Sequence, residues 1–257
     1  MMKDLPEELF DFAFIPAWDE KLEQLAELAE PENWDYQFTD ADGKKPILGN
    51  YLKHTYKRLA REEKVELASN GQHVTFNTGL VTPSQEPIYA LFNQNRKPDA
   101  RQPWYFQRFV RRGEADLNSF DQLPEMAHYF DDPAVLVFDH RKDFRVNVEH
   151  IVSENKERFP EPYCNMDEYV LQTLLKGSID NARERVRRNY KTAVPNFYRG
   201  KVQLMLPLCI SNAAKADLAL VIEDHNSFYR AATCLMLDWA YGNARLLAKP
   251  DKEWLQP

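Results

Sequence analysis

Residues 201–237, "KVQLMLPLCISNAAKADLALVIEDHNSFYRAATCLML", decide the fold of the chain. The stretch holds three runs rich in apolar residues, and only a few polar residues separate each run from the next. Runs of this length and composition predict strands, and short polar connections are typical of neighbouring antiparallel strands. We therefore expect three adjacent strands, at 201–210, 216–224 and 229–237.

The rest of the chain divides into helical and strand-like stretches. The longest helical pattern, 165–195, repeats apolar residues every three or four positions and ends at Pro195. Because helices and strands occur in separate groups joined by short loops, the sequence predicts an α+β fold, a single domain with a mainly antiparallel sheet flanked by helices. The remaining helical patterns cover 18–30, 50–68, 144–160 and 238–250, and the remaining strand-like patterns cover 71–80, 88–92, 103–110 and 134–138.

The N-terminal region is far more acidic than the remainder. Residues 1–35 contain eleven Asp and Glu residues against Lys3 and Lys21, whereas the whole chain of 257 residues has a net charge of only −7. We interpret residues 1–40 as an acidic helical extension and residues 41–257 as a single α+β domain. Trp18 and Trp34 lie in this extension, which is a candidate segment for docking on a protein partner or for masking a basic cleft.

Several classes of protein are disfavoured. No apolar run approaches the roughly 20 residues of a membrane-spanning helix, and the first residues lack the order of a signal peptide, so we expect no membrane association and a cytoplasmic location. The three cysteines have no CxxC spacing, and the chain has no P-loop, dinucleotide-binding or serine-hydrolase motif. We therefore expect no bound metal and no cofactor.

Cations gather in two parts of the chain. Residues 95–112 carry six Lys and Arg residues against Asp99, and residues 176–201 carry eight against Asp180 and Glu184. An acidic chain with local basic clusters does not suit indiscriminate coating of DNA, but it is compatible with a discrete phosphate site.

Short polar side chains follow two of the predicted strands. Asn77 and Thr78 follow the apolar part of the first, and Asn95 and Arg96 follow the second. Such residues are common turn formers, and they are also the groups that contact phosphates, sugars and base edges. The sequence leaves both interpretations open.

The helical stretch 144–160 holds a second set of candidates. His150 is a candidate general acid or base, and Asn155 and Arg158, three residues apart, share a face that could contact a phosphate. The alternative is that these are ordinary surface or buried side chains. The absence of an HExxH motif excludes a metal hydrolase of that kind.

The C-terminal part supplies the remaining candidates. Lys201 and Gln203 alternate with apolar residues and therefore project from one face of a strand, where a phosphate and a base edge could bind. The alternative is a solvated basic surface for the lysines and arginines, and a helix start for Tyr241, Asn243 and Arg245. The further candidates are Arg188, Lys191, Tyr241, Asn243 and Arg245.

Six stretches together resemble one bacterial family, which is catalogued as domain of unknown function 3825. They agree with it in order and spacing from about residue 45 to residue 255. The resemblance implies an association with nucleic-acid-binding modules of the cold-shock kind, and with it a role on RNA or nucleotides. Trp239 and Gly242 replace the more usual Met and Asn, which leaves Asn243 without a neighbouring amide. The stretches are "FNTGL", "IYALFNQN", "HIVSENKERFP", "NYKTAVPNFYRGKVQLMLPLCI", "DLALVIE" and "YGNARLLAKPDKEWL".

Three functional hypotheses remain. The leading one is a nucleotide- or RNA-binding domain with a discrete, polar and basic cleft. The second is a metal-independent enzyme that acts on a phosphoester or glycosidic bond of RNA or a nucleotide, with His150 as acid or base. The third is a module that docks on a protein partner through residues 1–40. The sequence alone does not decide whether any bond is broken.

Overall fold

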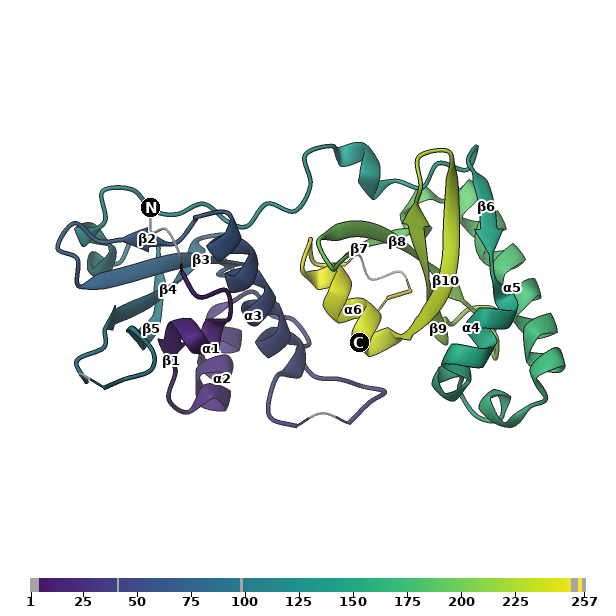
Figure 1. Ribbon diagram of the computed structural model, residues 1–257, viewed down its shortest axis with the longest axis horizontal. Coiled ribbons are helices and arrows are strands. Elements are labelled where there is room, and N and C mark those ends of the chain that lie inside the picture. Colours follow the sequence, from purple (N-terminus) through teal and green to yellow (C-terminus); the bar gives the residue numbers. More distant parts are fainter. Residues whose placement is uncertain (1–4, 41, 98, 251–253, 256–257) are drawn as a thin grey trace. The chain divides into compact units, whose positions relative to one another are not determined.

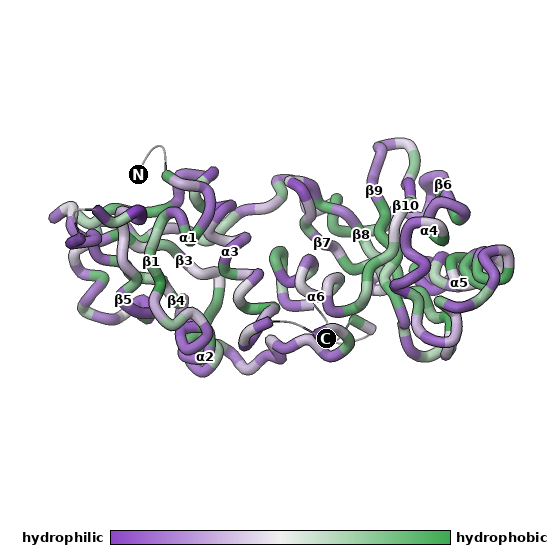
Figure 2. The backbone as a smooth tube through the Cα atoms, turned by 60° about the horizontal axis from the view of Figure 1, so that its bottom comes forward, coloured by the Kyte–Doolittle hydropathy of each residue, from purple (hydrophilic) through white to green (hydrophobic). Residues whose placement is uncertain are grey.

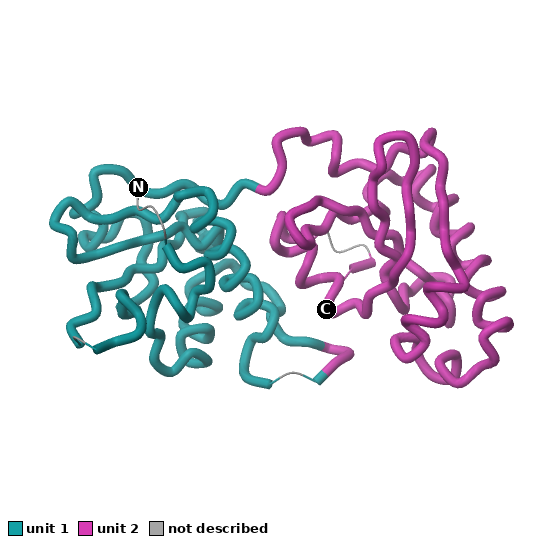
Figure 3. The backbone as a smooth tube through the Cα atoms, in the orientation of Figure 1, with its two compact units in different colours: residues 1–36, 40–128 teal, residues 37–39, 129–257 magenta. Residues whose placement is uncertain are grey.

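The computed structural model describes residues 5–40, 42–97, 99–250 and 254–255, and the chain forms two compact units (Figure 3). Unit 1 comprises residues 1–36 and 40–128, and unit 2 comprises residues 37–39 and 129–257. Each unit contains one five-stranded sheet. The predicted α+β class and the mainly antiparallel pairing are confirmed, but the strands divide between two sheets instead of forming the single sheet that we expected.

The sheet of unit 1 has the strand order β1-β5-β4-β3-β2. All its pairs are antiparallel except the short parallel pair of β1 with β5. One face is covered by helices whose aromatic side chains meet those of the strands, as in Phe12 of α1 against Phe92 of β4 and Tyr56 of α3 against Phe76 of β3, with ring centroids 5.3 and 5.5 Å apart. The elements are α1 (Leu9–Phe12), β1 (Ala13–Phe14), α2 (Trp18–Leu28), α3 (Pro46–Arg61), β2 (Glu66–Leu67), β3 (His73–Val81), β4 (Pro87–Gln94), β5 (Trp104–Arg111) and the 3₁₀ helix η1 (Ala115–Ser119).

The acidic N-terminal stretch contributes to the core of unit 1. Leu22 and Leu25 of α2 are buried, and so are Phe12 and Trp34. Trp34 is therefore not exposed for docking on a partner. Residues 37–39 belong to unit 2, and residues 1–4 lie outside the described part of the chain.

The sheet of unit 2 has the strand order β6-β10-β9-β8-β7, and only the pair of β6 with β10 is parallel. Helices α4 and α5 lie on one side of this sheet and α6 lies on the other (Figure 1). The elements are η2 (Pro133–Leu136), β6 (Asp143–Val146), α4 (Val148–Asn155), η3 (Lys156–Arg158), η4 (Tyr163–Asn165), α5 (Glu168–Arg188), η5 (Tyr190–Thr192), β7 (Val194–Tyr198), β8 (Lys201–Leu208), β9 (Leu218–Asp224), β10 (Phe228–Met236) and α6 (Leu237–Arg245).

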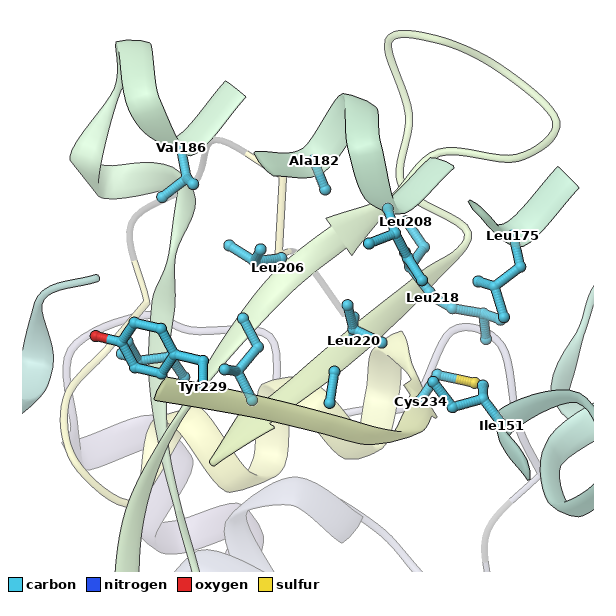
Figure 4. Packing of buried hydrophobic residues seen from close by; sticks show 14 of the residues in the cluster. Ile151, Leu175, Ala182, Val186, Leu206, Leu208, Leu218, Leu220, Tyr229 and Cys234 are labelled. Carbon is cyan, nitrogen blue, oxygen red and sulfur yellow. The ribbon is translucent and has the colours of Figure 1, made fainter. Parts of the chain in front are cut away.

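Helix α5 builds the main core of unit 2. The Asp167 side chain caps its first turn by accepting a hydrogen bond from the Tyr169 backbone N–H at 2.9 Å. A stripe of apolar residues then recurs every three or four positions and packs on alternate residues of β8, β9 and β10 (Figure 4). The stripe consists of Leu171, Leu175, Ile179, Ala182 and Val186.

Two local predictions are wrong. Residues 134–138 were expected to form a strand, but Asp132 and Pro133 start the 3₁₀ helix η2, in which the Asp132 carboxylate accepts the Ala134 N–H at 2.9 Å. The expected helix 144–160 begins as strand β6, because its first residues pair with the distant β10, and Asn147 then caps α4. The local periodicity reveals neither the Asp132 cap of η2 nor the pairing of β6 with β10.

Two further observations concern the described residues as a whole. No helix among them combines the length and the apolar character needed to cross a bilayer. No group of three or more His, Cys, Asp or Glu side chains in the described ranges is placed to hold a metal ion.

Candidate functional site

A cavity of about 780 Å³ lies on the face of the unit 2 sheet opposite α5. Its floor consists of outward-facing residues of β8, β9 and β10, and η3 and α6 contribute to its walls. Lys201 and Gln203 face the cavity, whereas Leu204 and Leu206 of the same strand face the core. The alternation of a strand thus separates a polar face from an apolar one. Strand β9 changes along its length, from hydrophobic residues in its middle to hydrophilic residues at its end (Figure 2), and Glu223 at this end lines the cavity.

A β-bulge in β10 brings two consecutive residues to the cavity. Ala231 pairs with Ile222 and Thr233 pairs with Val221, so Ala232 is the extra residue. Ala232 and Thr233 both line the cavity, and Cys234 returns to the core. Burial raises the pKa of the Cys234 thiol to about 12, so this cysteine is a neutral core residue.

Arg158 is held at the wall of the cavity by a small network. Its Nη1 donates to the Cys234 carbonyl at 2.7 Å and to the Asn155 Oδ1, and it lies 3.4 Å from the Thr233 Oγ1. Thr233 also donates to the Asn155 Oδ1 at 3.0 Å, and Asn155 is itself fixed to the Ile151 carbonyl. The buried Nε of Arg158 has no hydrogen-bond partner among the described residues. Arg158 is thus positioned without an ion pair to any carboxylate in the described part of the chain.

The hairpin between β7 and β8 presents a further cation. Tyr198 pairs with Lys201, and the two residues between them, Arg199 and Gly200, have φ values of +48° and +83°. Two left-handed residues in a two-residue loop are typical of a type I′ turn, which matches the twist of the flanking strands. Arg is an unusual residue in this conformation, where Asn, Asp and Gly are favoured. Arg199 lines the cavity, with its guanidinium 5.2 Å from the Tyr198 ring centroid.

The charge of the cavity is strongly positive. Four cations line it, and Glu223 is the single carboxylate among its lining residues. Glu223 accepts a hydrogen bond from the Gln203 Nε2 at 3.0 Å and lies 3.6 Å from the His225 Nε2. Within the described ranges, the side chains of Lys201 and Arg230 have no hydrogen bond or ion pair. The four cations are Arg158, Arg199, Lys201 and Arg230.

Two exposed aromatic rings complete the cavity. Trp239 of α6 is 40% exposed, and the Arg158 guanidinium lies 5.6 Å from its ring centroid. Tyr198 is 47% exposed at the end of β7. Large aromatic side chains are ordinarily buried, so two that remain exposed beside cations suit a planar ligand with a negative charge.

Four of the residues proposed from the sequence line this cavity, and one supports it. Asn155 is 2% exposed, and its amide positions Arg158 instead of facing a ligand. The four lining residues are Arg158, Lys201, Gln203 and Asn243.

Four others lie in unit 1, where their contacts are those of local structure. Asn77 and Thr78 do not follow a strand, because β3 continues through them as a bulge. Thr78 Oγ1 donates to the Ile88 carbonyl at 2.7 Å, and Asn77 Oδ1 accepts the Gly79 N–H at 2.9 Å. Gly79 has φ +74°, and a Cβ there would lie 2.5 Å from the Tyr51 hydroxyl. Asn95 accepts the Lys97 N–H in a turn, and Arg96 is exposed.

The remaining candidates lie in unit 2 but outside this cavity. His150 is exposed in the first turn of α4, where its N–H donates to the Asn147 cap at 3.1 Å. Arg188 is exposed at the end of α5, and Lys191 lines a smaller, separate cavity of about 290 Å³. Tyr241 is 5% exposed, and Arg245 is half-buried in the last turn of α6.

Sequence reasoning missed several residues of the cavity. Arg230 could have been found, because it is the single charged residue of the predicted strand 229–237, and charged side chains rarely face a core. Thr233 could not, because the bulge that turns it toward the cavity has no local signal. The missed lining residues with polar or aromatic side chains are Tyr198, Arg199, Glu223, Arg230, Thr233 and Trp239.

Comparison with known proteins gives one match. The chain matches the family described as Domain of unknown function (DUF3825) over residues 25–254, which include all the residues that line the cavity. Neither the curated proteins nor the solved structures contain a match.

Proposed function

Because the chain belongs to the family described as Domain of unknown function (DUF3825), whose description names no activity, we propose its function from the cavity of unit 2. The proposal is that unit 2 binds a nucleotide, either free or as part of an RNA strand. The observation that carries it is the combination of four cations and two exposed aromatic rings in one cavity of about 780 Å³.

Each part of a nucleotide has a matching group in the cavity. Arg and Lys side chains bind phosphate through charge-assisted hydrogen bonds, and the unpaired Lys201 and Arg230 are available for this. Trp239 and Tyr198 offer faces on which a base can stack, an interaction of about 1–3 kcal/mol per base. The amides of Gln203 and Asn243 can contact a sugar hydroxyl or a base edge. Such ligands also agree with the cytoplasmic location that the sequence suggests.

Binding is favoured over catalysis. The enzyme hypothesis required His150 as an acid or base, and His150 lies outside the cavity on the exposed part of α4. The lining residues include only one carboxylate, Glu223, so the cavity lacks the paired carboxylates of many hydrolytic sites.

The test is a binding measurement with single-site variants. Nucleotides and a labelled short RNA are titrated against the wild-type protein, Lys201→Ala and Arg230→Ala. Each substitution removes one charge-assisted contact and is expected to weaken binding about tenfold. Arg187→Ala is the matched control, because Arg187 is an exposed arginine of α5, on the other side of the sheet. Unchanged affinity in both cavity variants, with the fold intact, would refute the proposal.

A further inference from the structure

A second cavity, of about 600 Å³, adjoins the first. It is lined by the end of β6, the start of α4 and part of α5, and it contains three cations against one carboxylate, Glu149. Arg230 lines both cavities, so they meet at this residue of β10. The other two cations are Arg145 of β6 and Lys176 of α5.

The strand register connects the two cavities through a row of polar side chains. Arg230 pairs with Arg145 on β6 and with Glu223 on β9. Glu223 is hydrogen-bonded to Gln203 of β8, which pairs with Asn196 of β7. The row therefore crosses all five strands, a distance of roughly 19 Å at the usual strand spacing.

The positive end of this row is electrostatically unfavourable in the free protein. Like charges directly opposite each other on neighbouring strands destabilise a sheet, and Arg145 and Arg230 are such a pair. Arg145 is compensated in part, because its Nε lies 2.8 Å from the Asp143 carboxylate. Arg230 lies opposite Glu223 on β9 but forms no ion pair with it within the described ranges, and the Glu223 carboxylate accepts a hydrogen bond from Gln203 instead. An anion between the two arginines would relieve their repulsion.

The second cavity also has an aromatic surface. The Phe228 ring lies under the Arg145 guanidinium, 3.8 Å from its carbon to the ring centroid, and is stacked on the His225 ring at 5.0 Å. Cations interleaved with aromatic rings are the usual means of holding a single strand, since every base has a face that can stack. A base-paired duplex hides those faces and does not use such rings.

We propose that the ligand is a single strand of RNA several nucleotides long, which lies across the sheet and occupies both cavities. A free mononucleotide would leave the second cavity unused, because the first alone falls within the range of about 300–1,000 Å³ that encloses a small ligand. Phosphates of the same strand lie near Lys201 in the first cavity and near Arg145 and Lys176 in the second.

This inference rests on the proposed function. A Lys176 variant tests the inference separately from the proposed function, because Lys176 lines only the second cavity. Affinities are measured for a uridine mononucleotide, for an eight-nucleotide single-stranded RNA and for the same RNA as a duplex. Wild-type protein is expected to bind the single strand at least tenfold more tightly than the mononucleotide or the duplex. Lys176→Ala should weaken single-strand binding several-fold, reduce its salt dependence by about one phosphate contact and leave mononucleotide binding unchanged.

The controls and the contrary outcomes are distinct. Arg187→Ala removes another exposed cation of α5 that lies outside both cavities and should change nothing. Three outcomes would overturn the inference and leave the proposed function standing. The mononucleotide could bind as tightly as the longer strand, Lys176→Ala and Arg145→Ala could leave single-strand binding unchanged, or the duplex could bind more tightly than the single strand. Failure of all three ligands to bind would overturn both.

Discussion

At the scale of single residues, the orientation of the Arg158 side chain depends on Asn155. The Asn155 Oδ1 accepts hydrogen bonds from both Arg158 and Thr233, and its Nδ2 donates to the Ile151 carbonyl at 3.0 Å. Both lone pairs of its Oδ1 and one of its two N–H donors are therefore used within the protein, and its role is to orient the guanidinium. This assignment separates a positioning residue from the residues that would face the proposed ligand.

Asn155→Ala should affect both stability and binding. The substitution removes the acceptor of the half-buried Thr233 hydroxyl and one of the acceptors of Arg158, and we expect a loss of about 1–3 kcal/mol in the free energy of unfolding. Arg158 also loses its orientation, so RNA affinity should fall in the folded variant. Denaturant unfolding and RNA titration at a temperature well below the melting transition measure the two effects separately.

Ser153→Ala is the matched control for Asn155, because Ser153 lies in the same helix and is exposed. It should change neither quantity. If Asn155→Ala lost stability but bound RNA with wild-type affinity, Arg158 would not need this orientation.

At the scale of elements, the β7–β8 hairpin holds Arg199 in a backbone conformation that is unfavourable for arginine, beside the cavity of the proposed ligand. Arg199 occupies a left-handed position that costs a residue other than Gly, Asn or Asp about 1 kcal/mol or more. Arg199→Asn should therefore raise the free energy of unfolding by about 0.5–1 kcal/mol while it weakens RNA binding. Equal or tighter RNA binding by this variant would show that Arg199 has no contact with the ligand.

The end of α3 contains the clearest pH-dependent element. Glu62 lies 3.0 Å from the Lys64 Nζ and accepts the His128 backbone N–H at 3.1 Å. Burial disfavours the charged carboxylate, but the contacts with Lys64, His128 and Arg58 outweigh it and lower the pKa of Glu62 below its usual value of 4.5. Because the pKa is lower in the folded state, the ionised group stabilises unit 1 above pH 4.5, and this stabilisation is lost as the pH falls through the folded value.

Glu62→Gln is expected to lower the stability of unit 1 by about 1 kcal/mol at pH 7 and to have less effect at pH 3. Denaturant unfolding at the two pH values measures the difference. Glu125 is a suitable control, since it is 77% exposed and 3.6 Å from Lys64, so Glu125→Gln should have little effect at either pH. A loss of stability from Glu62→Gln that is independent of pH would contradict this account.

The elements also show what the sequence can and cannot reveal. Strong local periodicity correctly predicts α2, α5 and the strands β3, β4, β5, β8, β9 and β10. The short strand β6 and the bulge at Ala232 depend on pairing with distant strands, and nothing in the local sequence marks them. Lys201 and Gln203 could be placed in the site because they alternate with apolar residues in β8. Thr233 could not, because the bulge in β10 interrupts the alternation. Asn77 and Thr78 show the opposite error, since turn-forming chemistry resembles ligand-binding chemistry in a sequence.

At the scale of the whole molecule, a segment before residue 40 is part of unit 2. The buried Asp238 carboxylate accepts hydrogen bonds from the backbone N–H groups of Gln37 and Phe38 at 3.0 and 2.8 Å, and from the Thr39 hydroxyl at 2.9 Å. This contact places residues 37–39 beside the first turn of α6. Unit 2 is therefore not a simple C-terminal half of the chain.

Asp238→Ala should release this segment. Three charge-assisted hydrogen bonds are lost, so we expect unit 2 to lose about 3 kcal/mol of stability. Hydrogen–deuterium exchange should rise in residues 37–39 and in α6 and stay unchanged in β3–β5 of unit 1. Asp180→Ala, at an exposed acidic residue of α5, is the control. Unchanged exchange in residues 37–39 would show that Asp238 does not hold them.

The central claim is that RNA lies on the face of the unit 2 sheet beside α6 and continues past the edge strand β6 into the second cavity, which α4 and α5 help to line. Photochemical crosslinking of a short single-stranded RNA, followed by identification of the crosslinked peptides, tests it most directly. The account predicts crosslinks at Tyr198, Phe228 and Trp239, the aromatic residues of the two cavities. Crosslinks confined to the exposed Tyr105 of unit 1, or to Tyr169 on α5, would contradict it.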